Sequence, residues 1–193
     1  MVLFYQRDPN ASTDVWLTPP ELVQALGVFD LDPCACGFIP KWKQLARAWM
    51  GLDFGVDSLT KRWRGRVWLN PPYSIWPAFM EKLKQHGNGI ALIFARTETK
   101  GFDEHIWKGA DAVFFLKRRI KFKLPDGSNP KNGATQPSVL IAYGHNNVDA
   151  IQAAWDRGDI EGYLVRLTSS DVERRFWIPD PDPVQANWQE NDW

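Results

Sequence analysis

Short apolar runs alternate along this chain with stretches whose spacing of apolar residues is typical of helices. Strands that are separated by helices usually pair in parallel, and both faces of their sheet must then be covered. The pattern therefore predicts an α/β fold, with a mostly parallel sheet and helices on both faces. We expect strands at residues 29–32, 66–69, 89–95, 111–116, 138–143 and 161–165, and helices at 19–26, 41–49, 76–85, 102–108 and 146–156.

The chain is long enough to form one domain with its own core. It has 193 residues, of which 44% are hydrophobic and 13% are aromatic, and a chain of this size buries most of its apolar surface as a single unit. We expect residues 1–165 to form that domain. Residues 166–193 contain a stretch in which proline alternates with acidic residues, and their apolar residues show no periodicity. This pattern predicts an extended tail. Its Trp188 and Trp193 could dock on the domain.

The sequence argues against a membrane protein, a secreted protein and a metal centre. No apolar run approaches the length of a membrane span, and the first seven residues lack the order of a signal peptide, so we expect a cytoplasmic protein. Cys34 and Cys36 are too close for an ordinary disulfide and too few for a structural zinc site. His86, His105 and His145 have no ligand spacing, and no metal is expected.

Asn70-Pro71-Pro72-Tyr73 directly follow the apolar run at 66–69 and suit one unusual reaction. An amino group on a flat ring is a poor nucleophile, because its lone pair is delocalised, so a catalyst must accept hydrogen bonds from both of its N–H groups. The side-chain oxygen of Asn70 and the carbonyl of Pro71 can do this, because the prolines hold the turn stiff and extended. Tyr73 supplies a ring for stacking. The pattern predicts methyl transfer to such an amine, and a proline-rich turn after a buried strand is the alternative.

Three further motifs precede this one. Thr-Pro-Pro at 18–20 opens a helix, Asp-Pro-Cys-Ala at 32–35 ends the first strand, and Asp-Ser-Leu at 57–59 comes next. This order resembles the phage-type family of DNA N-6-adenine methyltransferases, over roughly residues 14–144. The resemblance implies a Rossmann-like class I methyltransferase fold, S-adenosylmethionine as the cofactor, DNA as the partner and adenine N6 as the target. It also implies base flipping, because an adenine inside a duplex cannot reach a buried methyl donor.

The resemblance also assigns roles to single residues. The chain departs from the family pattern at residues 33–37, which hold only one glycine, and Asp53 is a weak candidate for the acid that binds the ribose. Without the resemblance, Thr18 fits a helix N-cap and Asp32 fits a turn cap. With the resemblance, catalysis is assigned to Asn70, Pro71, Pro72 and Tyr73. The cofactor would be contacted by Thr18 and Pro19 at its methionine end and by Asp57 at its adenine, with Asp32, Pro33 and Ala35 forming a cradle around it. Asn70 would contact the cofactor as well.

The chain has no net charge, but its charges are unevenly distributed. Residues 166–193 hold six acids and three arginines, so residues 1–165 carry a net charge of +3. The run at 117–123 places cations around Ile120 and Phe122, which predicts a strand with one apolar and one cationic face. The family carries an Arg-x-x-Phe element here. We expect a DNA-facing hairpin and loop at 117–135, with contacts from Lys117, Arg118, Arg119, Lys121, Phe122 and Lys123; an ordinary solvated face is the alternative.

Two smaller groups are candidates for the borders of the site. Arg96 and Thr97 follow the strand at 89–95 and would border the substrate or cofactor pocket, and a helix cap at Thr97 or Thr99 is the alternative. A second basic group lies ahead of the strand at 66–69 and would either contact phosphate or form a solvated turn. It consists of Lys61, Arg62, Arg64 and Arg66.

Other functions fit the same motif. Cytosine N4, an amino group of an RNA base and a protein glutamine present the same planar amine, so their methylation stays an alternative. A non-catalytic nucleic-acid-binding module of the same fold would need neither Asn70 nor Asp32. The basic run favours DNA as the partner, and a monomer is compatible with the sequence.

Overall fold

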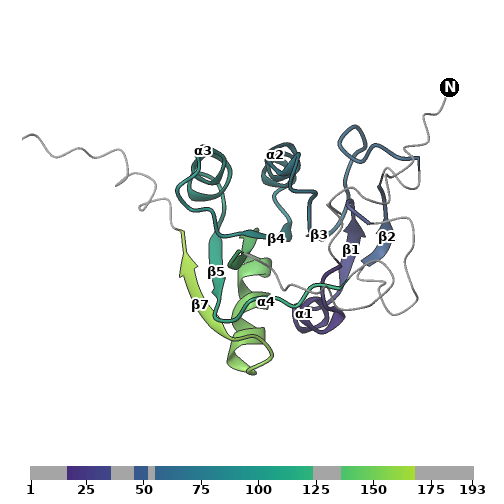
Figure 1. The fold of residues 1–193 in the computed structure, drawn as a ribbon. Coiled ribbons are helices and arrows are strands. Elements are labelled where there is room, and N and C mark those ends of the chain that lie inside the picture. The colour runs from purple at the N-terminus through teal and green to yellow at the C-terminus, as the bar shows by residue number, and fades with distance from the viewer. Residues whose placement is uncertain (1–16, 36–45, 52–54, 124–135, 168–193) are drawn as a thin grey trace, which may run out of the picture.

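A computed structural model describes residues 17–35, 46–51, 55–123 and 136–167. These residues form a seven-stranded sheet that is flanked by helices (Figure 1). The order across the sheet is β2-β1-β3-β4-β6-β5-β7. The strands are β1 (Phe29–Asp32), β2 (Ala46–Trp49), β3 (Val67–Leu69), β4 (Gly89–Phe94), β5 (Ala112–Leu116), β6 (Ser138–Tyr143) and β7 (Gly162–Arg166).

The expectation of a mostly parallel sheet is wrong, because the sheet is mixed. β2, β1, β3 and β4 pair in parallel, whereas β4 with β6, β6 with β5, and β5 with β7 pair antiparallel. Helices connect β4 to β5 and β6 to β7 in the chain. The two strands of each connected pair run in the same direction, as is usual for strands joined through a helix. β6 nevertheless lies between β4 and β5 and runs opposite to both. Local periodicity predicts a strand, but it does not predict which strands become neighbours.

Helices cover both faces of the sheet. α2 and α3 lie on one face, and α1 and α4 lie on the other (Figure 1). The α/β class predicted from the sequence is therefore confirmed. The helices are α1 (Pro20–Ala25), α2 (Trp76–His86), α3 (Lys100–Phe102), the π-helix η3 (Asp103–Trp107) and α4 (His145–Asp156).

The side chains of β3 alternate between two apolar cores. Trp68 packs with Val23 of α1 on one face, and its neighbours Val67 and Leu69 pack with Met80 of α2 on the other. All five side chains are at most 1% exposed. Burying one such side chain stabilises the fold by roughly 1.5–3 kcal/mol relative to leaving it in water. β3 is therefore anchored on both faces, and the turn that follows it starts from a fixed point.

The helix expected at 41–49 is wrong: residues 46–49 form the edge strand β2, and residues 41–45 lie outside the described residues. Alanine and arginine favour helices, but the backbone here pairs in parallel with β1, with Ala46 opposite Phe29. An edge strand that leaves most of its side chains exposed carries no alternating apolar pattern. The hydrogen bonds that β1 offers therefore override the local preference.

Apart from the strand expected at 117–123, the other expected elements begin and end within two residues of the observed ones. The helix expected at 102–108 is divided into the short α3 and the π-helix η3. β7 runs to Arg166, and Leu167 N donates to the Asp111 carbonyl at 2.8 Å, so the folded part extends beyond residue 165. The loop at 124–135 and the tail at 168–193 lie outside the described residues. No helix in the described segments is long and apolar enough to cross a membrane.

Candidate active site

The carboxyl ends of the parallel strands bring three of the expected segments to one edge of the sheet. β1 ends at Asp32, and Asn70 directly follows β3. Ligands of open α/β sheets bind at this edge. The segment ahead of α1 reaches the same edge, because Asn70 Nδ2 donates a hydrogen bond to Thr18 Oγ1 at 3.3 Å. A residue expected to contact the cofactor therefore lies against the residue expected to catalyse the reaction.

Thr18 does not cap α1. The N-cap is Pro19, and no side-chain hydrogen bond caps this helix. The interpretation of Thr18 as an N-cap is therefore wrong. Thr18 is only 3% exposed, and its hydroxyl is directed at Asn70 instead of the helix.

The turn from Asn70 to Tyr73 is stiff and partly buried. Pro71 is buried, and Pro72 and Tyr73 are half-buried. The Pro72 carbonyl accepts a hydrogen bond from Ile75 N at 3.2 Å, which leads the chain into α2. Within the described part of the chain, no backbone N–H donates a hydrogen bond to the Pro71 carbonyl. That carbonyl keeps its capacity to accept a hydrogen bond from a ligand next to Asn70.

Tyr73 stacks on an aromatic ring that the sequence analysis did not single out. The ring belongs to Phe94, the last residue of β4; the two ring centroids lie 3.9 Å apart and the planes are tilted by 5°. A near-parallel pair of this kind holds the plane of Tyr73. The signal in the sequence was an aromatic residue at a strand end, just ahead of Arg96 and Thr97. Phe94 is therefore a further candidate site residue.

Burial sets the protonation chemistry at the end of β1. Asp32 Oδ1 accepts a hydrogen bond from Cys34 N at 2.9 Å, but burial outweighs this contact and raises the pKa of Asp32 to about 7. Burial, and then the charge of Asp32, raise the pKa of the Cys34 thiol well above its ordinary value. Asp32 therefore titrates near neutrality. Among the described residues, no three His, Cys, Asp or Glu side chains are placed to hold a metal ion.

The turn after Asp32 is held by the end of β2. Met50 N donates to the Asp32 carbonyl at 2.9 Å, and Ala35 N donates to the Met50 carbonyl at 3.0 Å. Pro33, between them, is buried. A side chain at Gly51 would lie 2.3 Å from the Ala35 carbonyl oxygen, so only glycine fits there. Gly51 thus permits a close backbone approach in a cradle whose own loop holds few glycines.

Asp57 begins an exposed turn. Its Oδ1 accepts a hydrogen bond from Leu59 N at 3.0 Å, and its carbonyl accepts one from Thr60 Oγ1 at 2.8 Å. This is the geometry of an Asx turn. Among the described residues, no hydrogen bond joins Asp57 to Asp32 or Asn70, and Asp53 lies outside them. The contact of Asp57 with a cofactor adenine stays a prediction.

Residues 117–123, named here the basic segment, do not form the expected strand. β5 ends at Leu116, and the basic segment continues as irregular chain. Its last residue, Lys123, exchanges two backbone hydrogen bonds with Leu17, of 2.9 and 3.0 Å. The expected alternation of apolar and cationic residues is present: Ile120 and Phe122 pack in the core, and Lys117, Arg118, Arg119 and Lys121 are exposed. The expected contact of Phe122 with DNA is therefore wrong, because its side chain is buried.

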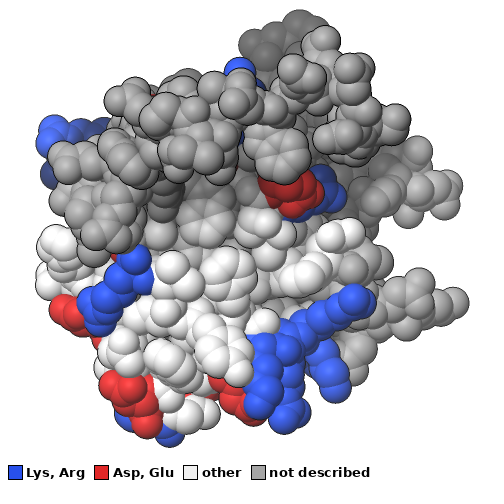
Figure 2. Space-filling view, turned by 90° about the vertical axis from the view of Figure 1, so that its left-hand side faces the viewer, with Lys and Arg blue, Asp and Glu red and all other residues white. Residues whose placement is uncertain are grey.

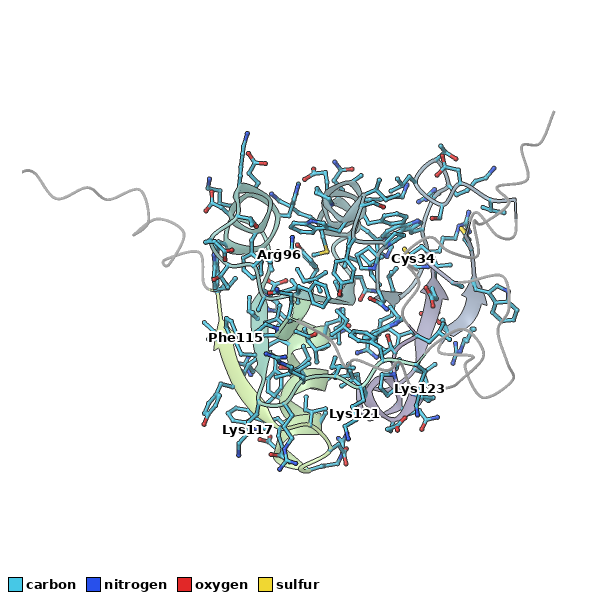
Figure 3. All side chains as sticks on the ribbon, in the orientation of Figure 1. Cys34, Arg96, Phe115, Lys117, Lys121 and Lys123 are labelled. Carbon is cyan, nitrogen blue, oxygen red and sulfur yellow. The ribbon has the colours of Figure 1, made fainter. Side chains whose placement is uncertain are left out.

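The cations of the basic segment extend from β5 towards α1. Lys117, Lys121 and Lys123 follow this path in order (Figure 3), and Lys and Arg side chains gather at one lower corner of the molecule in Figure 2. Glu161 lies 3.6 Å from Lys117 Nζ and 3.5 Å from Arg118 Nη2. Exposed ion pairs of this kind are weak. Glu161 therefore neutralises the segment only in part.

Arg66, from the second basic group, has a structural role. Its Nε donates to Asn147 Oδ1 at 2.6 Å, and its Nη1 donates to the Leu26 carbonyl at 2.9 Å. Burial lowers its pKa. It is therefore engaged inside the protein and does not offer a phosphate contact. An open hollow lies near the amino end of β3, at the opposite end of the strand from the site; it is lined by Arg62, Trp63, Arg64, Gly65, Lys82, Gln85 and His86.

Arg96 and Thr97 follow β4 at the same edge as the site. Arg96 is exposed. The Thr97 carbonyl accepts a hydrogen bond from Trp107 Nε1 at 3.3 Å. Thr99, and not Thr97, caps the next helix, because its hydroxyl accepts from Phe102 N. The helix-cap alternative is therefore confirmed for Thr99, and the pocket border stays a prediction for the other two.

Comparison with known proteins assigns the chain to a family. A family model described as DNA N-6-adenine-methyltransferase (Dam) matches residues 6–154. The chain belongs to this family. A DNA N-6-adenine-methyltransferase of Escherichia phage T1 is 21% identical over 181 residues, which are 89% of this chain and 71% of that protein. No solved structure matches the chain. The family resemblance found from the order of four short motifs is confirmed.

In this Dam-family chain, Asp32 ends β1 and Asn70 follows β3 at one edge of the sheet, and Thr18 contacts Asn70 there. Arg66 lies at the amino end of β3 and is held by protein groups. The structure adds Phe94 and Gly51 to the candidate site, because Phe94 stacks on Tyr73 and Gly51 packs against the Ala35 carbonyl. Neither residue belongs to a recognisable sequence motif.

Proposed function

We propose that this Dam-family protein transfers a methyl group from S-adenosylmethionine to the N6 amino group of adenine in DNA. The observation that carries the proposal is the stiff turn after β3. There the Asn70 side chain and the Pro71 carbonyl present hydrogen-bond acceptors at the carboxyl edge of a sheet anchored on both faces. Membership of the Dam family supports adenine and DNA as the target.

The residues at the end of β1 fit the cofactor. Asp32 offers a hydrogen-bond acceptor, Pro33 and Ala35 give a closely packed backbone, and Gly51 allows that backbone to approach β2. Pro19 and the backbone of Thr18 would face its methionine end, and Asp57 would hold its adenine. The cofactor, when bound, supplies an activated methyl group on a positively charged sulfur.

The chain's own groups bind and orient the target amine. Asn70 Oδ1 and the Pro71 carbonyl accept the two N–H groups of the flipped adenine, which turns the nitrogen lone pair out of the ring plane. The proton is lost after the transfer, so no strong base is required. Placement of the amine in a site that excludes water supplies much of the rate enhancement. Tyr73 stacks on the flipped base, and Phe94 keeps the Tyr73 ring in its plane.

The basic segment would hold the DNA backbone. Its exposed lysines and arginines suit phosphate contacts, which position a duplex without reading its sequence. Extrusion of the target base costs roughly a few kcal/mol, and these contacts help to offset it.

The product of the reaction tests this function. The full chain is incubated with methyl-labelled S-adenosylmethionine and unmodified DNA, and the DNA is digested to nucleosides. We expect the label in N6-methyladenine, with transfer lowered by about 100-fold or more in the Asn70→Ala variant. Label in N4-methylcytosine, in RNA or in protein would assign one of the alternative substrates. Absence of transfer to any of them, with DNA still bound, would indicate a binding module.

A further inference from the structure

We infer that Thr18 is a positioning residue that orients the Asn70 carboxamide, so that its oxygen faces the target amine. This inference deepens the proposed function and rests on it. It gives Thr18 a task that differs from the cofactor contact implied by the family resemblance. It also explains why a threonine 52 residues away in the sequence contacts the catalytic turn.

A carboxamide has two ends of opposite character. The oxygen accepts hydrogen bonds, and the nitrogen only donates them. An exocyclic amine offers N–H groups, so the side-chain oxygen of Asn70 can accept a hydrogen bond from it. The side-chain nitrogen of Asn70 would instead place one donor against another. The prolines after Asn70 fix the backbone, but the terminal torsion of an asparagine is broad. Some other group must therefore hold the amide in the useful orientation.

Thr18 supplies this constraint. Asn70 Nδ2 donates to Thr18 Oγ1, and engaging the nitrogen end turns the oxygen end away from Thr18. Thr18 is itself well fixed. It is 3% exposed, Leu17 before it is paired with Lys123, and Pro19 after it has a restricted φ of −55°.

The size of the effect follows from the hydrogen bond. At 3.3 Å the bond is slightly longer than usual, and a neutral hydrogen bond of this kind contributes modestly. We expect its removal to lower kcat by about 3- to 10-fold. The binding of either substrate should be spared, because the amide still occupies its place and only its orientation is freed.

Two variants separate the possible roles of Thr18. Valine has nearly the shape of threonine but lacks the hydroxyl, and serine keeps the hydroxyl but lacks the methyl group. We expect Thr18→Val to lower kcat while the Kd of S-adenosylmethionine, measured by calorimetry, and the Kd of DNA stay as in the wild type. Thr18→Ser should recover most of the missing kcat.

Two other results would overturn the inference. If Thr18 contacts the cofactor, Thr18→Val will weaken S-adenosylmethionine binding and leave kcat at saturating cofactor unchanged. If Thr18 only fills space, Thr18→Val will match the wild type and Thr18→Ser will be the more damaging change. If the wild type transfers no methyl group to adenine in DNA, the proposed function itself fails, so the two failures are distinguishable.

The Asn70→Asp variant provides a second measure of the same effect. Its carboxylate has oxygen at both ends, so either end can accept a hydrogen bond from the target amine and no orientation is needed. Thr18→Val should therefore reduce kcat less in the Asn70→Asp background than in the wild type. Equal reductions in the two backgrounds would show that Thr18 acts elsewhere. Far-ultraviolet circular dichroism of each variant controls for folding.

Discussion

Replacing Asp32 with asparagine should flatten the pH dependence of stability between about pH 4 and pH 7. Burial raises the pKa of Asp32 from 3.8 to about 7 in the folded protein. Between these two values the folded protein keeps a proton that the unfolded chain has released, so the free energy of unfolding falls as the pH rises. Below pH 4 both states are protonated and the penalty is absent. Above pH 7 it is fully present.

The magnitude follows from the pKa. A rise from 3.8 to about 7 is worth about 4 kcal/mol if the whole of it acts on stability. Asp32 is half-buried and keeps some contact with water, so we expect about 1–3 kcal/mol. Asparagine keeps the size of the side chain and an acceptor for Cys34 N, and it carries no charge. Asp32→Asn should therefore be more stable than the wild type at pH 8 and about equally stable at pH 4.

Urea unfolding followed by circular dichroism at constant ionic strength, from pH 4 to pH 8, measures this difference. Glu98→Gln is a suitable control, because Glu98 is an exposed acid at the same edge of the sheet. Its profile should follow that of the wild type. If Asp32→Asn differs from the wild type by the same free energy of unfolding at pH 8 as at pH 4, then Asp32 is ionised in the folded protein at little cost, and the argument from burial fails.

Three further predictions concern the site. Asn70→Ala should lower methyl transfer by about 100-fold or more and leave cofactor binding intact, because the missing acceptor acts on the amine in the transition state. Tyr73→Ala and Phe94→Ala should both lower turnover, and Tyr73→Phe should be milder, because stacking needs the ring and not the hydroxyl; single-turnover rates measure this. Replacing Arg119 and Lys121 with glutamine should reduce the log-log salt slope of DNA binding by about one for each phosphate that is no longer neutralised, with cofactor affinity unchanged.

Each of these has its own refutation. Activity of Asn70→Ala within a few-fold of the wild type would remove its assigned role. A normal rate for Phe94→Ala would show that Tyr73 does not depend on its neighbour. Salt titrations of the Arg119 and Lys121 double variant that overlay on the wild type would identify an ordinary solvated face. Lys108→Gln is the matched control for that titration, since it removes an exposed cation for which no phosphate contact is expected.

The central strands could be predicted because their signal is local. The runs at 89–95 and 138–143 are continuous and apolar, and both form strands buried on both faces. Residues 46–49 have no such signal, because an edge strand is mostly exposed and owes its structure to the hydrogen bonds that β1 offers. The reversed direction of β6 is likewise a property of three strands together, and periodicity along one strand cannot report it.

The candidate site divides in the same way. Asn70 and Asp32 could be found from sequence, because each is a polar residue at the end of an apolar run and each belongs to a short motif. The stacking of Tyr73 on Phe94 and the bond from Asn70 to Thr18 could not, because they join residues 21 and 52 positions apart in the chain. Such contacts depend on the order of strands in the sheet, which the sequence pattern leaves open.

Under the proposed function, the path of the basic segment would allow a chain without net charge to bind DNA at its site. Lys121 lies two residues before Lys123, whose backbone is paired with Leu17, and the next residue, Thr18, bonds the Asn70 side chain. The backbone that carries Lys121 is therefore linked to the turn at Asn70 through Leu17 and Thr18. Affinity for a polyanion depends on the few cations that reach its phosphates, and acids elsewhere in the chain are largely screened at physiological salt. Local placement of cations therefore matters more here than the overall charge.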